Sequence, residues 1–157
     1  MIEEPCNQTA EPSAIKLTPG GDRYGRELCL TRLREGRHLA TWIDSDGHHD
    51  EKICWRAIDG GQLGPIASLE PLHGAPASPQ ACGRWLLWSE YTGAGGTHVW
   101  ADLDSEVGRQ PAKAELAPLA GENCGGFCAA VDSSGTLWLV VDLWRGQDVV
   151  VKCLRYG

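Results

Sequence analysis

The sequence predicts an all-β protein made of three consecutive repeats, and three observations carry this prediction. The 157 residues include 20 glycines and 9 prolines, which suits many short strands joined by tight turns. Runs of about eight β-branched, aromatic and aliphatic residues occur in pairs, each pair separated by a polar loop. These pairs recur with a period of about 45 to 52 residues, which is typical of proteins built from repeated small sheets.

The strand pairs form the centre of each repeat. They occupy residues 36–44 with 52–59, 83–90 with 97–104, and 135–142 with 148–155. Aligning them matches two sets of three residues: Trp42 with Trp88 and Val140, and Trp55 with Trp100 and Val151. Because large aromatic side chains dominate packed interiors, we expect the four tryptophans to lie in the core between neighbouring sheets.

Further strands flank each pair. A strand of mostly small residues precedes it, at 27–33, 77–82 and 126–131, and we expect this strand to be the innermost. Another strand follows it, at 65–69 and 112–116. The third repeat has no following strand, but residues 14–19 match 67–71 and 114–118, since each segment begins with alanine and ends in Leu-x-Pro. We therefore expect segment 14–19 to complete the last sheet, in the same chain or in a partner.

A four-stranded repeat of this length is typical of a β-propeller blade. Three blades are fewer than the four to eight of known propellers, so we predict a homodimer whose two chains join head to tail into a six-bladed ring. The expected organisation is an extension over 1–13 and a propeller unit over 14–157, with blades at about 20–65, 66–111 and 112–157 and the closing strand at 14–19. The alternatives are a piece of a longer chain and a β fold of small sheets other than a propeller.

Two segments resemble the blades of sialidase-like bacterial propellers. In Ser78-Pro-Gln-Ala-Cys-Gly83-Arg-Trp-Leu-Leu-Trp88, a Ser-Pro opens the inner strand and a glycine leads a strand ending in tryptophan. The stretch Asp132-Ser-Ser-Gly-Thr-Leu-Trp138 is similar in its second half. The resemblance implies the propeller fold. It does not extend to glycoside hydrolysis, because neither the Asp-box pattern in register nor the sialidase catalytic residues can be placed.

Charge and hydropathy disfavour several classes of binding partner and of cellular location. The formal net charge is −7 and no basic run occurs, which disfavours nucleic acid and anionic membrane surfaces as partners. No segment approaches the ~20 apolar residues of a membrane span. Residues 1–17 lack a signal-peptide pattern, so we expect a cytoplasmic protein.

The seven cysteines are interpreted as free thiols. Their number is odd, and several lie inside apolar strand patterns. Only Cys124 and Cys128 are close in sequence, and no second pair accompanies them at zinc-finger spacing.

Candidate binding residues lie where the second strand of each repeat meets the third, because these loops open on one face of a propeller. Three carboxylates take the same place in the repeats, and three other polar or aromatic residues stand near them: Asp44, Glu90 and Asp142, with Tyr91, Trp144 and Arg145. Carboxylates accept hydrogen bonds from hydroxyl groups, and aromatic rings stack on sugars. The alternative interpretation is that these acids end strands and solvate turns.

The first of these loops also offers candidate metal ligands. They are Asp44, Asp46, His48 and Asp50, in a stretch too short for an EF-hand loop. A divalent cation is one hypothesis for this loop, and a solvated hairpin is the other. No further cofactor is expected.

No nucleophile elbow, phosphate loop or serine–histidine–acid grouping stands out. We therefore expect a non-catalytic module that binds a carbohydrate or another polar small molecule. The alternatives are a scaffold that binds another protein through the same face, and an enzyme with metal-assisted hydrolase or lactonase chemistry.

Overall fold

The computed structural model describes residues 16–18, 21–33, 36–48, 50–103, 113–115 and 123–156. Every regular element in this part of the chain is a β-strand, so the predicted all-β class is confirmed. The strands are β1 Tyr24–Arg32, β2 His38–Ser45, β3 Glu51–Asp59, β4 Gln62–Leu69, β5 Ala75–Cys82, β6 Trp85–Thr92, β7 Gly95–Asp102, β8 Lys113–Glu115, β9 Asn123–Val131, β10 Leu137–Arg145 and β11 Asp148–Tyr156. No helix suited to crossing a membrane occurs among these residues. The expected extension 1–13 lies outside them.

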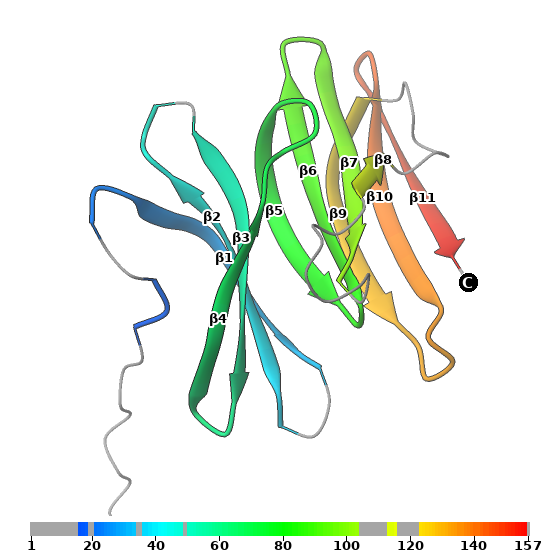
Figure 1. The fold of residues 1–157 in the computed structure, drawn as a ribbon. Coiled ribbons are helices and arrows are strands. Elements are labelled where there is room, and N and C mark those ends of the chain that lie inside the picture. Colours follow the sequence, from blue (N-terminus) through cyan, green and yellow to red (C-terminus); the bar gives the residue numbers. More distant parts are fainter. Residues whose placement is uncertain are drawn as a thin grey trace, which may run out of the picture.

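The strands form three antiparallel sheets in which each strand pairs with its neighbour in sequence. The sheets contain β1–β4, β5–β8 and β9–β11, and they stand side by side in chain order (Figure 1). β4 pairs with β3 and closes the first sheet, as expected for the strand that follows the first pair. Likewise β8 pairs with β7 and closes the second sheet. The third sheet has three strands in the described part of the chain.

Tight glycine turns join the strands, as the composition predicts. Between β3 and β4 the two turn residues are Gly60 and Gly61, whose φ angles are 54° and 84°. Positive φ at both central positions is the requirement of the hairpin turn that matches the natural twist of two antiparallel strands, and glycine meets it without a steric cost.

Two apolar clusters hold the three sheets together. Between the first and second sheets lie Ile53, Leu69, Leu86, Trp88, Val99 and Ala101. Between the second and third lie Cys82, Leu87, Cys124, Ala129, Leu137, Leu139, Val141 and Leu143. The middle sheet is thus apolar on both faces, because successive residues of β6 point to opposite sides. Each fully buried leucine or valine contributes about 1.5–3 kcal/mol through removal of apolar surface from water.

The tryptophans occupy these layers with one departure from expectation. Trp88 lies between the first two sheets, but Trp42 is buried on the outer face of the first sheet, away from the second. The alignment of Val140 with Trp88 was wrong by one position. Val141 is 1% exposed and faces the second sheet, whereas Val140 is 43% exposed on the opposite face. A one-residue offset reverses the side of a sheet on which a side chain lies.

The first strands of the three sheets adjoin one another: β5 contacts both β1 and β9. Polar side chains tie each of these strands to its neighbour. The Thr31 hydroxyl donates to the Ala81 carbonyl at 2.9 Å, and the Gln80 amide donates to the Ala129 carbonyl at 3.2 Å. Both β1 and β5 contain a bulge, at which Glu27 and Ser78 have φ of 52°. The bulge turns residues out of the regular alternation of these inner strands.

Candidate functional site

A pocket of about 440 Å³ lies between the first and second sheets, beside the loop that joins β2 and β3. In Figure 1 this loop and the β6–β7 and β10–β11 turns lie at the top of the view, at one end of the three sheets. Ionisable side chains supply one part of the lining: Arg26, His48, Asp50, Glu51 and Glu70. Small or apolar residues supply the rest: Pro71, Gly74, Ala75 and Pro76.

Arg26 is the fixed cation of this pocket. Its Nη2 donates to Oε1 of Glu51 at 2.8 Å and to the carbonyl of Pro76 at 3.1 Å, and its Nη1 pairs with Glu27. Glu27 in turn accepts a hydrogen bond from the backbone N–H of Ser78. These contacts join β1 to β3 and to β5, so they hold the wall of the pocket across the junction of two sheets.

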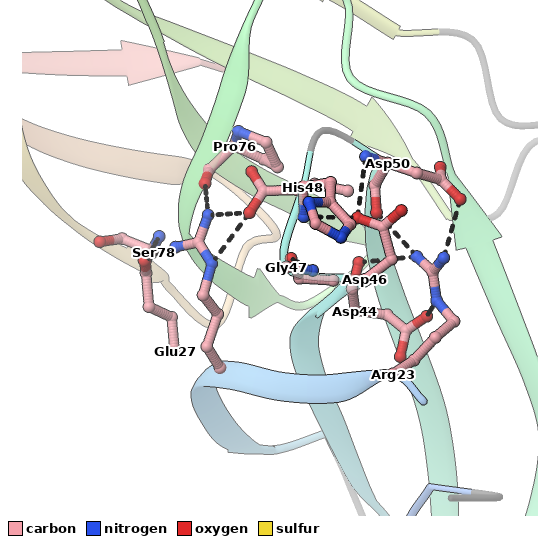
Figure 2. A network of polar contacts seen from close by, with 12 residues as sticks. Arg23, Glu27, Asp44, Asp46, Gly47, His48, Asp50, Pro76 and Ser78 are labelled. Atoms are coloured by element: carbon pink, nitrogen blue, oxygen red, sulfur yellow. Dashed lines mark hydrogen bonds and ion pairs between the residues drawn. The ribbon is translucent and has the colours of Figure 1, made fainter. Parts of the chain in front are cut away.

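The β2–β3 loop is held by a second network (Figure 2). Oδ1 of Asp46 accepts the backbone N–H groups of His48 at 2.8 Å and Asp50 at 3.2 Å. The hydrogen bond from His48 is the main cause of the lowered pKa of Asp46. Arg23 pairs with Asp44, and its Nη1 donates to Oδ2 of Asp50 at 2.7 Å. The loop is thereby fixed with His48 and Asp50 on the pocket side.

Acidic groups outnumber basic ones around the pocket. Glu70 forms an ion pair with Lys52, in which Nζ lies 3.0 Å from Oε1, and this contact raises the pKa of Lys52. Of the lining residues, Asp50, Glu51 and Glu70 are acidic and Arg26 is the one that is always basic. Such a lining favours neutral or cationic ligands over anionic ones.

Glu90 has a different role from the one its sequence position suggested. It is completely buried, and its two oxygens accept the backbone N–H groups of Leu72, His73 and Gly74 together with Nε1 of Trp88 at 2.6 Å. The carboxylate therefore fixes the connection between the first two sheets. This connection supplies part of the pocket wall, so Glu90 stabilises the wall without lining the pocket itself.

Three other candidate residues lie around Gly125 of the third sheet, and of these Tyr91 comes from the second sheet. The Tyr91 hydroxyl donates to the carbonyl of Gly125 at 3.3 Å. A Cβ atom on Gly125 would lie 2.6 Å from both Asp142 oxygens and 2.4 Å from Nε1 of Trp144, so these side chains crowd around the glycine. Oδ1 of Asp142 is buried and has no hydrogen-bond partner among the described residues. Arg145 is exposed at the end of β10.

The candidate residues therefore do not form one site. Asp44 is paired with Arg23 at the first loop, Glu90 is buried, and Tyr91, Asp142 and Trp144 lie a sheet further along. The four candidate metal ligands are divided between the Arg23 ion pairs and the Asp46 turn. In the described part of the chain, no three His, Cys, Asp or Glu side chains converge to hold a metal ion. Cys124 and Cys128 lie on opposite faces of the third sheet, since the first is buried against the second sheet and the second is exposed.

The site includes three residues that the sequence did not single out: Arg26, Glu51 and Glu70. The sequence contained one usable signal, because two charged residues, Arg26 and Glu27, stand at the start of an inner strand in which small residues were expected. Their partners could not be found from the sequence, since Arg26 and Glu51 are 25 residues apart.

His98 is a buried titratable group between the second and third sheets. Its Nδ1 lies 3.0 Å from the Ser89 hydroxyl, and its ring meets that of Phe127 edge-on with 5.1 Å between the ring centroids. Its Nε2 is buried and has no partner in the described part of the chain. Burial lowers its pKa to about 4, although the charge of Asp142 acts in the opposite direction. The imidazole is therefore neutral in the folded protein at neutral pH.

This pKa predicts a loss of stability in mild acid. Below pH ~6.5 the unfolded chain takes up a proton at His98, whereas the folded chain does not until pH falls to about 4. The free energy of unfolding is expected to decrease by about 2 kcal/mol between pH 7 and pH 5, since each unit in this interval contributes about 1.4 kcal/mol. Urea titrations at both pH values measure it, with His98→Gln as the non-titrating comparison. Equal pH slopes for the two proteins would contradict the assignment.

No protein-family model, curated protein or solved structure matches this chain.

Proposed function

We propose that this protein is a non-catalytic binding module that takes a hydroxyl-rich small molecule, such as a neutral or amino sugar, in the pocket between its first two sheets. The observation that carries the proposal is the pocket itself, which has a volume of about 440 Å³ and is lined by charged donors and acceptors together with two prolines. Small-molecule sites commonly have volumes of ~300–1,000 Å³, which this pocket falls within.

The chemistry of the lining supports this class of ligand. Carboxylate oxygens of Asp50, Glu51 and Glu70 accept hydrogen bonds from hydroxyl or ammonium groups, while Arg26 donates. Pro71 and Pro76 offer apolar surface for the C–H faces of a ring. The networks around Asp46 and Glu90 hold the pocket walls before a ligand arrives, which reduces the entropy lost on binding.

We also propose that the three sheets are blades of a propeller ring, completed by a second copy of the chain. Support comes from the sheets standing face to face in chain order and from the contacts of β5 with both β1 and β9. In such a ring the pocket lies at the loop end of a junction between two blades, where ring-shaped folds bring separate loops together.

Binding is tested with a panel of neutral monosaccharides and disaccharides, amino sugars and sugar acids, first by thermal shift and then by calorimetry. Neutral or amino sugars are expected to raise the melting temperature, and sugar acids are not, because of the acidic lining. Replacing Glu51 by glutamine removes a charged acceptor and weakens the contact that orients Arg26, so the dissociation constant is expected to rise roughly 10- to 100-fold.

The matched control lies on the same strand. Asp59 is at the opposite end of β3 from Glu51, outside the pocket, so Asp59→Asn should leave sugar affinity unchanged. Failure of every sugar to bind, or equal effects of the two variants, would overturn the proposed ligand class.

A further inference from the structure

The third sheet is open on the side away from the second sheet. Its exposed face carries apolar residues from two strands: Trp138, Val140 and Trp144 of β10, with Val149 and Val151 of β11. Val151 is 67% exposed. Cys128 and Cys153, the two cross-strand neighbours of Val140, are exposed on the same face.

This face of the third sheet is mainly apolar, as is typical of a sheet face that is covered by a neighbouring sheet. In an antiparallel sheet with one face in water, the strands alternate between apolar and polar residues. In β10 the side facing the second sheet is apolar, at Leu139 and Val141, and the opposite side carries Trp138, Val140 and Trp144 with a single acid, Asp142. The second sheet, which has a neighbour on both faces, shows the same pattern. The third sheet is thus built to have a neighbour on its open face.

The N-terminal segment shows which neighbour fits. Leu17 packs against the outer face of the first sheet, on the cluster that contains Trp42 and Cys54. These two residues are cross-strand partners, as are Trp88 and Val99 of the second sheet. The cluster around Trp88 and Val99 receives Leu69, from the last strand of the sheet before it.

Leu17 therefore stands against the first sheet as Leu69 stands against the second. Leu69 belongs to a fourth strand that pairs with β3 of its own sheet. Since Leu17 contacts the first sheet in the way that Leu69 contacts the second, the segment around Leu17 lies where the fourth strand of a sheet preceding the first sheet would lie. The carbonyl of Leu17 is anchored there by Nη1 of Arg56 at 3.0 Å.

We infer that this preceding sheet is the third sheet of a second copy of the chain. The third sheet has the open apolar face, and among the described residues no fourth strand pairs with its edge strand, β11. The first sheet carries the segment around Leu17 in the position of a fourth strand, but the sheet to which that strand would belong is not in this copy of the described chain. The open face of one copy then packs on the outer face of the other copy's first sheet, around Trp42. The segment around Leu17 adds to the edge of β11. This inference rests on the proposed blade arrangement and is independent of the proposed ligand.

Solution mass tests the inference directly. Light scattering coupled to gel filtration should give about twice the 17.0 kDa of one chain for the intact protein. Val140→Glu places a charge in the centre of the open face, and Leu17→Asp removes the apolar contact of the N-terminal segment. Each variant is expected to weaken dimerisation on the order of 100-fold, because burial of an unpaired charge is strongly unfavourable. Leu72→Glu, an equal change at an exposed loop position, should leave the dimer intact.

Mixing the two variants distinguishes head-to-tail pairing from a symmetric contact between two third sheets. A Leu17→Asp chain keeps an intact open face, and a Val140→Glu chain keeps an intact N-terminal segment, so together they restore one head-to-tail interface and a heterodimer. In a symmetric dimer, Leu17→Asp has no effect and the mixture forms no heterodimer. That result would overturn the inference, as would a monomeric intact protein.

Thiol alkylation gives a readout that needs no core substitution. Cys128 and Cys153 should be protected in the intact protein at high concentration and react rapidly in the Val140→Glu variant, while Cys29, which lies off this face, should react equally in both. Rapid reaction of Cys128 and Cys153 in the intact protein would show that the face is uncovered and would overturn the inference. Sugar binding without dimerisation would leave the pocket proposal standing, and dimerisation without sugar binding would leave this inference standing.

Discussion

Replacing Glu90 by alanine is expected to lower the free energy of unfolding by about 4 kcal/mol, because four donors, one buried and three partly buried, lose their acceptor at once. Three of them are consecutive backbone N–H groups of the 72–74 connection, and the fourth is Nε1 of Trp88. A buried donor without a partner costs about 1–3 kcal/mol, and water entering the space left by the side chain recovers part of the loss. Urea denaturation followed by tryptophan fluorescence measures the change.

Two further variants separate this network from a general effect of losing an acid. Glu90→Gln keeps one acceptor oxygen but turns an amide group toward the remaining donors, so its loss should be intermediate. Glu70→Ala removes a carboxylate whose side chain is 56% exposed and whose partner is a surface lysine, so its effect should be below about 1 kcal/mol. If Glu90→Ala and Glu70→Ala were equally stable, the network would not stabilise the fold.

Gly96→Ala is the second change with a large expected effect, about 3 kcal/mol of destabilisation. Gly96 lies in β7 where this strand passes β9 of the third sheet. An added Cβ would lie 2.3 Å from the carbonyl oxygen of Cys124 and 2.8 Å from the Tyr91 ring. The first of these is a backbone atom and cannot rotate away, so the methyl group must force the second and third sheets apart. The melting temperature and the urea midpoint should both fall.

Gly93→Ala provides the matched control in the same hairpin. A Cβ at Gly93 would meet no atom within 4 Å, so this substitution should change the stability by less than about 0.5 kcal/mol. Equal stability of the two variants would show that the second and third sheets approach less closely at this point.

The hairpins of this fold depend on local sequence, whereas the pocket depends on contacts between segments far apart in the chain. The hairpins were predictable: the expected pair 36–44 and 52–59 is found as β2 and β3, and the expected two-strand pattern recurs in the other sheets. These features are local, because alternation of side chains and glycine turns act over a few residues. The return of β4 and β8 onto their own hairpins followed from the same local signals.

The roles of the acids were not predictable in this way. Asp44, Glu90 and Asp142 all stand near the end of the second strand of their repeat, yet one is paired with an arginine, one is fully buried, and one lies half-buried beside a glycine. A carboxylate at the end of a strand has the same local sequence whether it solvates a turn or accepts backbone donors from a distant segment. Only the positions of those segments decide between the two.

The sequence alone determined the all-β class, the paired strands and their repetition, because strand formation depends on side chains two residues apart and on turns of two or three residues. The tertiary structure decided which face of each strand is buried, as Val140 and Val141 show, and which charged groups meet, as Arg26 and Glu51 show. Both depend on contacts between segments far apart in the chain. There a shift of one residue reverses the exposed and buried sides, and no local pattern records the partner.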